Sequence, residues 1–399
     1  MAYEQTGLAS RVSDMPVSRL SGMAGIGVDR MGTLADHADD PDLLRLENLD
    51  TDLRPPPGVV EATREAADRD DANSYLPFLG TDELRRAATD LVSRTAGVGY
   101  DWKRSTIISA GGLNGILDVL LAVLEPDDEV VLLDPIYIGL VNRVRLAGGV
   151  PRFARCEVRD GVWKLDRDRL AAAVGERTRA FLMMSPAMPS GAVLDRGDWT
   201  AVCEACRAAG AWMIYDSAME RILFDGLEPL HPASFPGMAE RTITVGAVSK
   251  EYRMIGWRVG WIVAPPEIVD DVGLVSISNV VCNVGIAQAA ATVALRTPDA
   301  DVAAATVEWQ RRRDVILGEL GGYQVIQPQG GWSLLVDVGP LGLTGAEASE
   351  RLLQHGKVAA TPMTGWGSER SAGFVRLVFS NEPCERLRGL VDRFAAALG

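Results

Sequence analysis

Lys250 and Arg258 are the two residues whose types and spacing most plainly suggest chemistry. A deprotonated lysine can form a Schiff base with a carbonyl group, and arginine presents a rigid fork of donors that suits phosphate. A short β-rich run over residues 242–245 precedes the lysine, and glycines punctuate the segment after it. The pair predicts a site for a compound that carries both a carbonyl and a phosphate. The alternative is a surface lysine and a surface arginine that flank a buried turn.

A glycine pair forms a second candidate site. Gly111 and Gly112 follow a predicted strand at residues 107–108 and precede a predicted apolar helix over residues 113–124. A helix that starts directly after a strand leaves backbone N–H groups free and directs the positive end of its dipole outward, which favours an anion. The alternative is that both glycines serve only a tight turn between strand and helix.

Alternating strands and helices must hold these residues. Short, continuously apolar strands that alternate with helices predict an α/β protein with a parallel or mixed sheet covered on both faces. The predicted strands cover residues 130–133, 152–158, 180–184, 212–215, 242–245 and 258–263, and the helices between them cover 137–147, 169–174 and 198–209. Ligands of such sheets bind at the carboxyl ends of the strands. Asp216, Lys250, Tyr137 and the glycine pair all lie at such ends, so we expect one shared site.

The two ends of the chain differ from this pattern. We predict a polar, irregular N-terminal arm over residues 1–45, in which glycines prevent a long helix. The large domain covers residues 71–299, and a smaller domain combines residues 46–70 with 300–399. The smaller domain has a predicted short strand at 44–49, a helix at 59–67, a long helix at 299–317, strands at 323–326, 332–338 and 373–379, and helices at 345–354 and 383–398.

Composition excludes several functional classes. A net charge of −14 argues against nucleic-acid and anionic-membrane partners. No apolar run approaches the roughly 20 residues that span a bilayer, and the first residues lack a signal-peptide pattern, so a cytoplasmic protein is expected. Cys203 and Cys206 form a CxxC inside a predicted helix without a second pair, and the three histidines are far apart in sequence. We therefore expect no metal site.

With these features the chain resembles the class I/II aminotransferase family of fold type I pyridoxal-phosphate enzymes. The resemblance extends from about Leu44 to the C-terminus, and its most specific motif is Ser249-Lys250 followed by Gly256-Trp257-Arg258-Val259-Gly260. It implies a large domain with a mixed, mostly parallel sheet, a smaller α+β domain built from both chain ends, and a homodimer. It also implies pyridoxal 5′-phosphate as the cofactor.

The resemblance implies roles for three charged residues. Lys250 corresponds to the catalytic lysine that forms the Schiff base, and Arg258 corresponds to the phosphate-binding arginine. Asp216 corresponds to the carboxylate that pairs with the pyridinium nitrogen. It keeps this nitrogen protonated, so that the ring can accept electrons.

Further cofactor contacts follow from the same resemblance. Gly111, Gly112, Leu113 and Asn114 match the loop whose backbone amides hold the phosphate. Tyr137 is similar to the aromatic residue that stacks on the ring.

Two more residues match positions outside this loop. Tyr75 matches a tyrosine that crosses the dimer interface to the neighbouring phosphate. Arg376 matches the arginine that binds the substrate α-carboxylate, a bidentate task that suits arginine. Taken alone, Arg376 would be interpreted as a charge on an edge strand.

Four positions depart from the family pattern, and one of them is Ala247, where the family commonly has a serine three residues before the lysine. Met188 replaces an asparagine and Met219 a tyrosine, both of which donate to the phenolic oxygen of the ring in the family, whereas methionine has no donor. We therefore expect a more basic ring oxygen and a Schiff base that stays protonated to higher pH. Leu49 replaces a glycine beside the carboxylate site, which suggests a bulky or unusual substrate side chain. The alternative for both methionines is neutral drift in a working transaminase.

The leading hypothesis is a pyridoxal-phosphate-dependent aminotransferase of specialised metabolism, in which Lys250 forms the Schiff base and then moves the Cα proton. The alternative keeps these steps but leads to elimination or replacement at Cβ or Cγ, cyclisation or oxidase chemistry. A non-enzymatic regulatory domain is disfavoured by the acidic charge.

Overall fold

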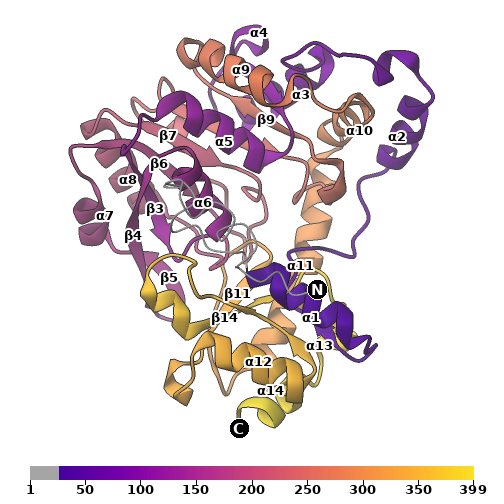
Figure 1. Cartoon of the computed structure of the whole chain (residues 1–399), viewed down its shortest axis with the longest axis vertical. Helices are drawn as coiled ribbons and strands as arrows, with labels where there is room; N and C mark the ends of the chain where they lie inside the picture. The colour runs from indigo at the N-terminus through magenta and orange to yellow at the C-terminus, as the bar shows by residue number, and fades with distance from the viewer. Residues whose placement is uncertain (1–26) are drawn as a thin grey trace, which may run out of the picture.

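An eight-stranded sheet forms the centre of the larger part of the molecule in a computed structural model that describes residues 27–399 (Figure 1). In spatial order its strands are β2 (Thr106–Ser109), β9 (Gly260–Val263), β8 (Thr242–Ala247), β7 (Trp212–Asp216), β6 (Thr178–Met184), β3 (Glu129–Asp134), β4 (Val150–Arg159) and β5 (Val162–Leu165). The five strands from β8 to β4 are parallel, whereas β9 and β5 are antiparallel to their neighbours. The prediction of a mixed, mostly parallel sheet is therefore confirmed.

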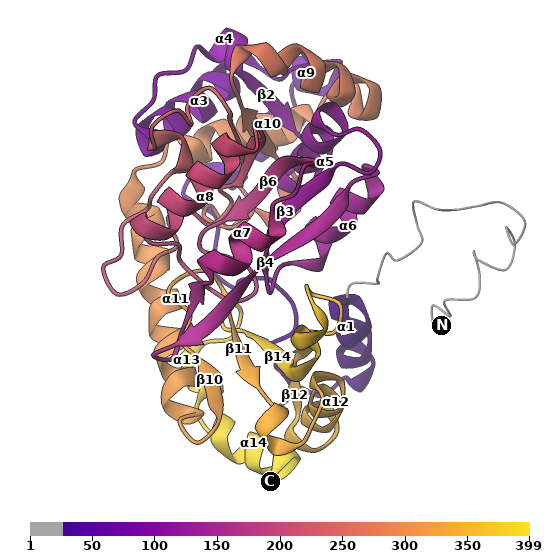
Figure 2. The ribbon, with the colours of Figure 1, turned by 90° about the vertical axis from the view of Figure 1, so that its left-hand side faces the viewer.

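Helices cover both faces of this sheet, which explains why its central strands are apolar along their whole length. Figure 2 shows α7 and α8 on one side and α5 and α6 on the other. The helices of this part are α2 (Val59–Ala67), α3 (Asp82–Ala96), α4 (Trp102–Ser105), α5 (Gly112–Val123), α6 (Ile138–Leu146), α7 (Arg167–Ala173), α8 (Arg196–Ala208), α9 (Pro266–Val280) and α10 (Gly285–Leu295). None of the helices in the described part is long and apolar enough to span a bilayer.

A smaller antiparallel sheet lies at the other end of the long helix α11 (Asp299–Glu319) (Figure 1). Its strands are ordered β10 (Gln324–Ile326), β11 (Ser333–Asp337), β14 (Phe374–Val378) and β13 (Thr361–Pro362). Around it lie α1 (Gly27–Ala38), α12 (Gly345–Gly356), α13 (Cys384–Leu387) and α14 (Leu390–Leu398). Strand β1 (Leu44–Arg45) pairs in parallel with β12 (Val358–Ala359), so both chain ends build this smaller part, as predicted.

Three local predictions were wrong. Residues 27–38 of the predicted irregular arm form helix α1, because Met31 and Ala35 are buried and this tertiary packing outweighs the low helix propensity of glycine. The predicted terminal helix over 383–398 breaks into α13 and α14 at Gly389, whose φ is +78°. The predicted strand over 44–49 has only two residues, since its other residues leave β12 for the pocket described below.

Strand β5 was not predicted, and it forms a hairpin with β4. The turn between them contains Asp160 and Gly161, both with positive φ, as tight hairpin turns require. Helix α2 belongs to the predicted smaller domain but packs against α10. The division into domains stays a prediction, and residues 1–26 of the predicted arm lie outside the described residues.

Candidate active site

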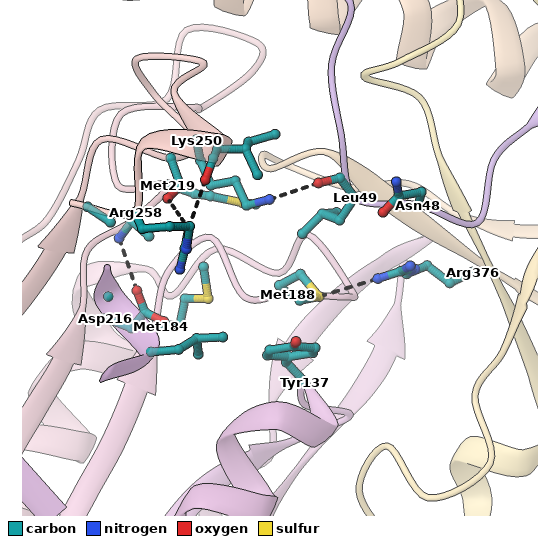
Figure 3. Close-up of a pocket in the computed structure, with 16 residues that line it drawn as sticks. Asn48, Leu49, Tyr137, Met184, Met188, Asp216, Met219, Lys250, Arg258 and Arg376 are labelled. Atoms are coloured by element: carbon teal, nitrogen blue, oxygen red, sulfur yellow. Dashed lines mark hydrogen bonds between the residues drawn. The ribbon is translucent and has the colours of Figure 1, made fainter. Parts of the chain in front are cut away.

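A cavity of about 300 Å³ opens at the carboxyl ends of β7 and β8, with walls from both sheets (Figure 3). This position follows the rule that ligands of α/β sheets bind beyond the carboxyl ends of the strands. The lining includes ten of the predicted site residues, which are Leu49, Gly112, Leu113, Tyr137, Met188, Asp216, Met219, Lys250, Arg258 and Arg376. The structure thus brings together residues that are up to 327 positions apart in the sequence, between Leu49 and Arg376.

Lys250 lies just beyond the end of β8, and its amine points into the cavity. Its Nζ donates a hydrogen bond to the carbonyl oxygen of Leu49 at 2.9 Å and lies 4.7 Å from the ring centroid of Trp332. Burial lowers the pKa of Lys250 to about 7, although the carboxylate of Asp50 opposes this shift. A large fraction of the lysine is therefore a neutral amine near pH 7, as a nucleophile toward a carbonyl group must be.

Asp216 is the last residue of β7 and faces the same cavity. Its Oδ1 accepts a hydrogen bond from the backbone N–H of Ala218 at 3.1 Å. Burial raises the pKa of Asp216 to about 6, while that hydrogen bond acts in the opposite direction. A cation placed beside this carboxylate would lower its pKa again. The residue is therefore suited to pair with a protonated ring nitrogen.

Arg258 lies beside the start of α5, at one end of the cavity. Its Nη1 donates to the carbonyl of Ile255 at 2.9 Å and to Oγ of Ser249 at 3.3 Å. A Cβ atom on Gly111 would lie only 2.5 Å from Nη2 of Arg258, so glycine is required for this close approach. The first-turn N–H groups of α5 and this guanidinium together favour a phosphate.

Arg376 projects from β14 at the opposite end of the cavity and is only 1% exposed. Its Nη2 donates to Oγ1 of Thr361 at 3.1 Å and to the carbonyl oxygen of Glu47, and its Nη1 contacts Sδ of Met188 at 3.8 Å. Burial lowers the pKa of Arg376 to about 10. Its guanidinium remains charged at neutral pH and is suited to bind a carboxylate.

Tryptophan rings lie beside two cationic side chains of the cavity, Lys250 and Arg376. Trp332 lies under Lys250, as described, and Trp366 lies under Arg376 with 4.8 Å between Cζ and the ring centroid. Trp366 also contacts Tyr137 edge to face, with ring centroids 5.4 Å apart. Tyr137 is held at the N-terminus of α6, so its ring can stack on a flat ligand in the cavity.

Methionines line the part of the cavity between these ends. Met188 and Met219 are 6% and 2% exposed, and Met184, at the end of β6, joins them. Thioethers offer no hydrogen-bond donor. The two substitutions that were predicted to alter the site therefore do face the cavity.

Three predicted residues do not line the cavity in a single chain. Gly111 lies behind Arg258, as described. Asn114 accepts a hydrogen bond from the backbone of Ala110 at 3.0 Å and donates to Asp118 at 3.3 Å, so its side chain shapes the loop. Tyr75 is 81% exposed and lies outside the cavity of its own chain.

Several lining residues were not predicted. Asn48 and Ile255 reach the cavity from loops, and no pattern in the sequence distinguishes them. Met184 ends β6, and the strand-end rule that identified Asp216 could have found it. The two tryptophans carry no local signal, because their contacts depend on how distant segments pack.

A metal site has no support in the described part of the chain. No group of three or more His, Cys, Asp or Glu side chains between residues 27 and 399 is placed to hold a metal ion. Burial raises the pKa of both Cys203 and Cys206 to about 12, so these thiols stay protonated and poorly nucleophilic.

Comparisons with known proteins agree with this geometry. Residues 43–394 match the family model described as aminotransferase class I and II. The chain is 32% identical to the arginine–pyruvate transaminase AruH of Pseudomonas aeruginosa over 357 residues, which cover 87% of this chain and 89% of that enzyme.

Two solved structures are also similar. The N-succinyldiaminopimelate aminotransferase of Mycobacterium tuberculosis superposes with a TM-score of 0.89 at 31% identity, covering 96% of this chain and 100% of the other. The aspartate aminotransferase of Thermus thermophilus with maleate superposes with a TM-score of 0.87 at 30% identity, covering 96% and 99%.

Proposed function

Because the chain belongs to the class I and II aminotransferases, which are pyridoxal-phosphate-dependent transferases of fold type I, we propose that it transfers the amino group of an α-amino acid to a 2-oxo acid. The family, the fold and the cofactor are established by the comparisons. What we propose is the role of each residue and the exact reaction. The names of the relatives specify different amino acids, so they leave the substrate open.

The observation that carries the proposal is the shared cavity of Lys250, Asp216 and Arg376. A partly buried amine, a buried carboxylate and a buried guanidinium at separate positions of one cavity match the three groups that such a reaction must handle. These are the cofactor aldehyde, the cofactor ring nitrogen and the substrate carboxylate.

The residues present fit pyridoxal phosphate. Gly111 has no side chain, so space for a phosphate remains beside Arg258 at the start of α5. The carboxylate of Asp216 lies at the end of β7, where it can pair with the ring nitrogen. When bound, pyridoxal phosphate supplies an aldehyde for a Schiff base and a ring that accepts electrons from the substrate Cα. In this assignment Gly111, Gly112, Leu113, Asn114 and Arg258 hold the phosphate.

The remaining roles belong to side chains of this chain. Lys250 would accept the Cα proton at Nζ and deliver it to the former aldehyde carbon of the cofactor, and its pKa of about 7 suits a group that must both take up and release a proton. Asp216 keeps the ring nitrogen protonated, and Tyr137 holds the plane of the ring. Arg376 fixes the substrate carboxylate and thereby the direction of the Cα–H bond.

A second candidate function rests on Met188 and Met219. Both face the cavity and offer no donor, so the ring oxygen lacks the partners that the family ordinarily supplies. Altered electronics of the ring favour elimination, replacement, cyclisation or oxidase chemistry on the same class of substrate. A role in specialised metabolism and a cytoplasmic location are part of the proposal for the leading function, the aminotransferase, and rest on the sequence.

We also propose a homodimer in which Tyr75 reaches the partner's phosphate. Exposed apolar side chains on α5, on α9 and in the loops next to these helices support this arrangement. They include Phe78, Leu121, Leu274, Val281 and Val284, of which Leu274 is 67% exposed. Leu121 and Leu274 line one surface hollow together, and contiguous exposed apolar side chains are typical of an association surface.

One experiment separates the two candidate functions. The purified holoenzyme is incubated with a panel of amino acids in the absence of any 2-oxo acid, and the cofactor absorbance is followed. Stoichiometric conversion to the amino form of the cofactor supports transamination. Release of ammonia, loss of a side-chain fragment or consumption of oxygen under turnover supports the second candidate instead.

A further inference from the structure

Arg376 is a buried cation without a carboxylate partner among the described residues. The charge of Glu47 favours the protonated form of Arg376, but the Glu47 carboxylate is paired with Arg45 at 2.6 Å, and Glu47 bonds Arg376 only through its backbone carbonyl. No partner in residues 27–399 accepts from Nε of Arg376. An unpaired buried charge is costly, so another group must stabilise this guanidinium before substrate binds.

Trp366 is placed to provide this stabilisation. Its ring centroid lies 4.8 Å from Cζ of Arg376, within the range of a cation–π interaction. The indole is fully buried, which strengthens the interaction, and its backbone is fixed by hydrogen bonds. Its carbonyl oxygen accepts from the N–H of Ile136 at 3.2 Å and from Oγ of Ser371 at 3.0 Å.

We propose that Trp366 replaces a counter-ion for Arg376 and so keeps the N–H groups of Nε and Nη1, which have no oxygen partner among the described residues, available to the α-carboxylate of the substrate. This inference rests on the proposed function, in which Arg376 binds that carboxylate. A glutamate or aspartate in the same place would occupy the N–H groups that the substrate must use. An aromatic face stabilises the positive charge from above the guanidinium plane, whereas a carboxylate binds in that plane.

The same indole also contacts Tyr137, whose ring centroid is 5.4 Å away at an angle of 60°. Trp366 therefore supports both the residue that stacks on the cofactor ring and the residue that binds the carboxylate. It is a positioning residue, because it acts on the substrate through Arg376 and Tyr137.

The test compares Trp366→Leu and Trp366→Phe with a matched control, Trp163→Leu. Trp163 is also buried and has a guanidinium, that of Arg370, at 5.7 Å from its ring, but it lies outside the cavity. For each holoenzyme, KM and kcat are measured with an accepted amino acid and with its methyl ester, which lacks the carboxylate. Thermal unfolding and cofactor absorbance verify that each variant is folded and loaded.

The expected result is selective. Trp366→Leu raises KM for the amino acid by about 5- to 30-fold, the range that a desolvated cation–π contact supports, and changes kcat by less than KM. KM for the methyl ester stays unchanged, so the preference of the enzyme for the free acid over the ester becomes smaller. Trp366→Phe, which keeps an aromatic face, recovers part of the loss, and Trp163→Leu behaves as wild type.

Two results would overturn the inference. One is an equal effect of Trp366→Leu on the acid and on the ester, which would show a general packing role. The other is an unchanged KM in a folded Trp366→Leu enzyme, or a folded Trp366→Phe enzyme that recovers none of the loss. Failure of the proposed function looks different, because the wild-type enzyme itself would then show no preference for the acid over the ester.

Discussion

Sδ of Met188 lies 3.8 Å from Nη1 of Arg376, so a thioether is the group that links the proposed carboxylate-binding residue to the methionine-lined wall of the cavity (Figure 3). Sulfur is a weak acceptor and methionine has no donor. The position therefore cannot relay a hydrogen bond from Arg376 to an oxygen of the cofactor ring. With methionine at position 188, binding of the substrate carboxylate therefore affects the electron distribution of the cofactor ring less than it would with a polar residue there.

The first prediction concerns these methionines. Met188→Asn and Met219→Tyr each introduce a donor, which stabilises a ring phenolate and lowers the pH at which the bound cofactor loses its proton. The expected decrease in the midpoint is about 1–2 pH units, since a hydrogen bond to a charged group contributes about 1.5–3 kcal/mol. An absorbance titration of the holoenzyme measures it. Met188→Leu, which adds no donor, should leave the midpoint unchanged, and a wild-type midpoint below neutral pH would contradict the premise.

The second prediction concerns the pH dependence of cofactor uptake. Because burial lowers the pKa of Lys250 to about 7, its amine is protonated below this pH and free above it. The rate at which cofactor-free protein binds pyridoxal phosphate covalently should rise up to about pH 7 and then level off. Stopped-flow absorbance gives the profile, with Lys250→Ala as the blank. A rate that keeps rising toward pH 10, as for an ordinary lysine with a pKa of about 10.4, would refute this.

The third prediction is that Asp216 destabilises the protein without its cofactor. Folding raises the pKa of this acid from 3.8 to about 6, so the folded chain holds the proton more tightly than the unfolded chain. Its ionisation therefore costs stability as the pH rises from about 4 to 6, and the full cost of about 3 kcal/mol persists above 6.

Asp216→Asn removes this cost. The cofactor-free variant should be more stable to denaturant than the wild type at pH 8 and equally stable near pH 4. The same variant should lose most of its turnover, because an amide does not hold the ring nitrogen protonated. Equal stabilities at pH 8 would show that the carboxylate is better solvated than its burial indicates.

The fourth prediction uses two glycines with positive φ. Gly111 has a φ of +87°, and an added Cβ would lie 2.5 Å from Nη2 of Arg258, whereas Gly226 has a φ of +73° and no atom within 4 Å of an added Cβ. Both alanine variants strain the backbone, but only Gly111→Ala displaces the arginine. Its dissociation constant for pyridoxal phosphate should rise about 10- to 100-fold, as expected for a lost charged hydrogen bond. Gly226→Ala should retain wild-type affinity in the same equilibrium titration.

The fifth prediction concerns Tyr75, which is 81% exposed in a single chain. If Tyr75 serves the partner's site, a mixture of inactive Lys250→Ala chains and impaired Tyr75→Ala chains should regain activity after subunit exchange. The mixed dimer then has one site with both an intact Lys250 and an intact Tyr75 from the other chain. If Tyr75 serves its own chain, the mixed dimer has no intact site and activity stays at the level of the separate variants.

The sequence predicted the central sheet well because each strand carries its own signal. Strands such as β3 and β8 are apolar throughout, so their burial on both faces can be inferred without knowing their neighbours. Helix α1 was missed because packing against distant residues, rather than local propensity, stabilises it. Strand β5 was missed although its signal is local, since the turn at Asp160 and Gly161 joins it directly to β4. The break at Gly389 was missed because the apolar pattern continues across it.

The part of the site that lies at the carboxyl ends of the strands could be predicted from the sequence pattern, and the rest could not. Asp216, Lys250, Gly112 and Tyr137 follow strands of one sheet, so their shared location follows from topology. Trp366 gave no signal, because its contacts with Arg376 and Tyr137 join segments that are distant in sequence. The resemblance, and not the local pattern, identified Arg376.

Glu47 and Arg376 are 329 residues apart in the chain, yet the carbonyl of one accepts a hydrogen bond from the guanidinium of the other. At about 5–20 residues per second, a ribosome adds Arg376 roughly 15 to 65 s after Glu47. Asp216, Lys250 and the start of α5 all emerge before Arg376 and before the strand that pairs with β1. The residues proposed to bind the cofactor are thus synthesised before the arginine proposed to bind the amino acid. The order of synthesis matches the order of binding, because the enzyme must bind its cofactor before its substrate.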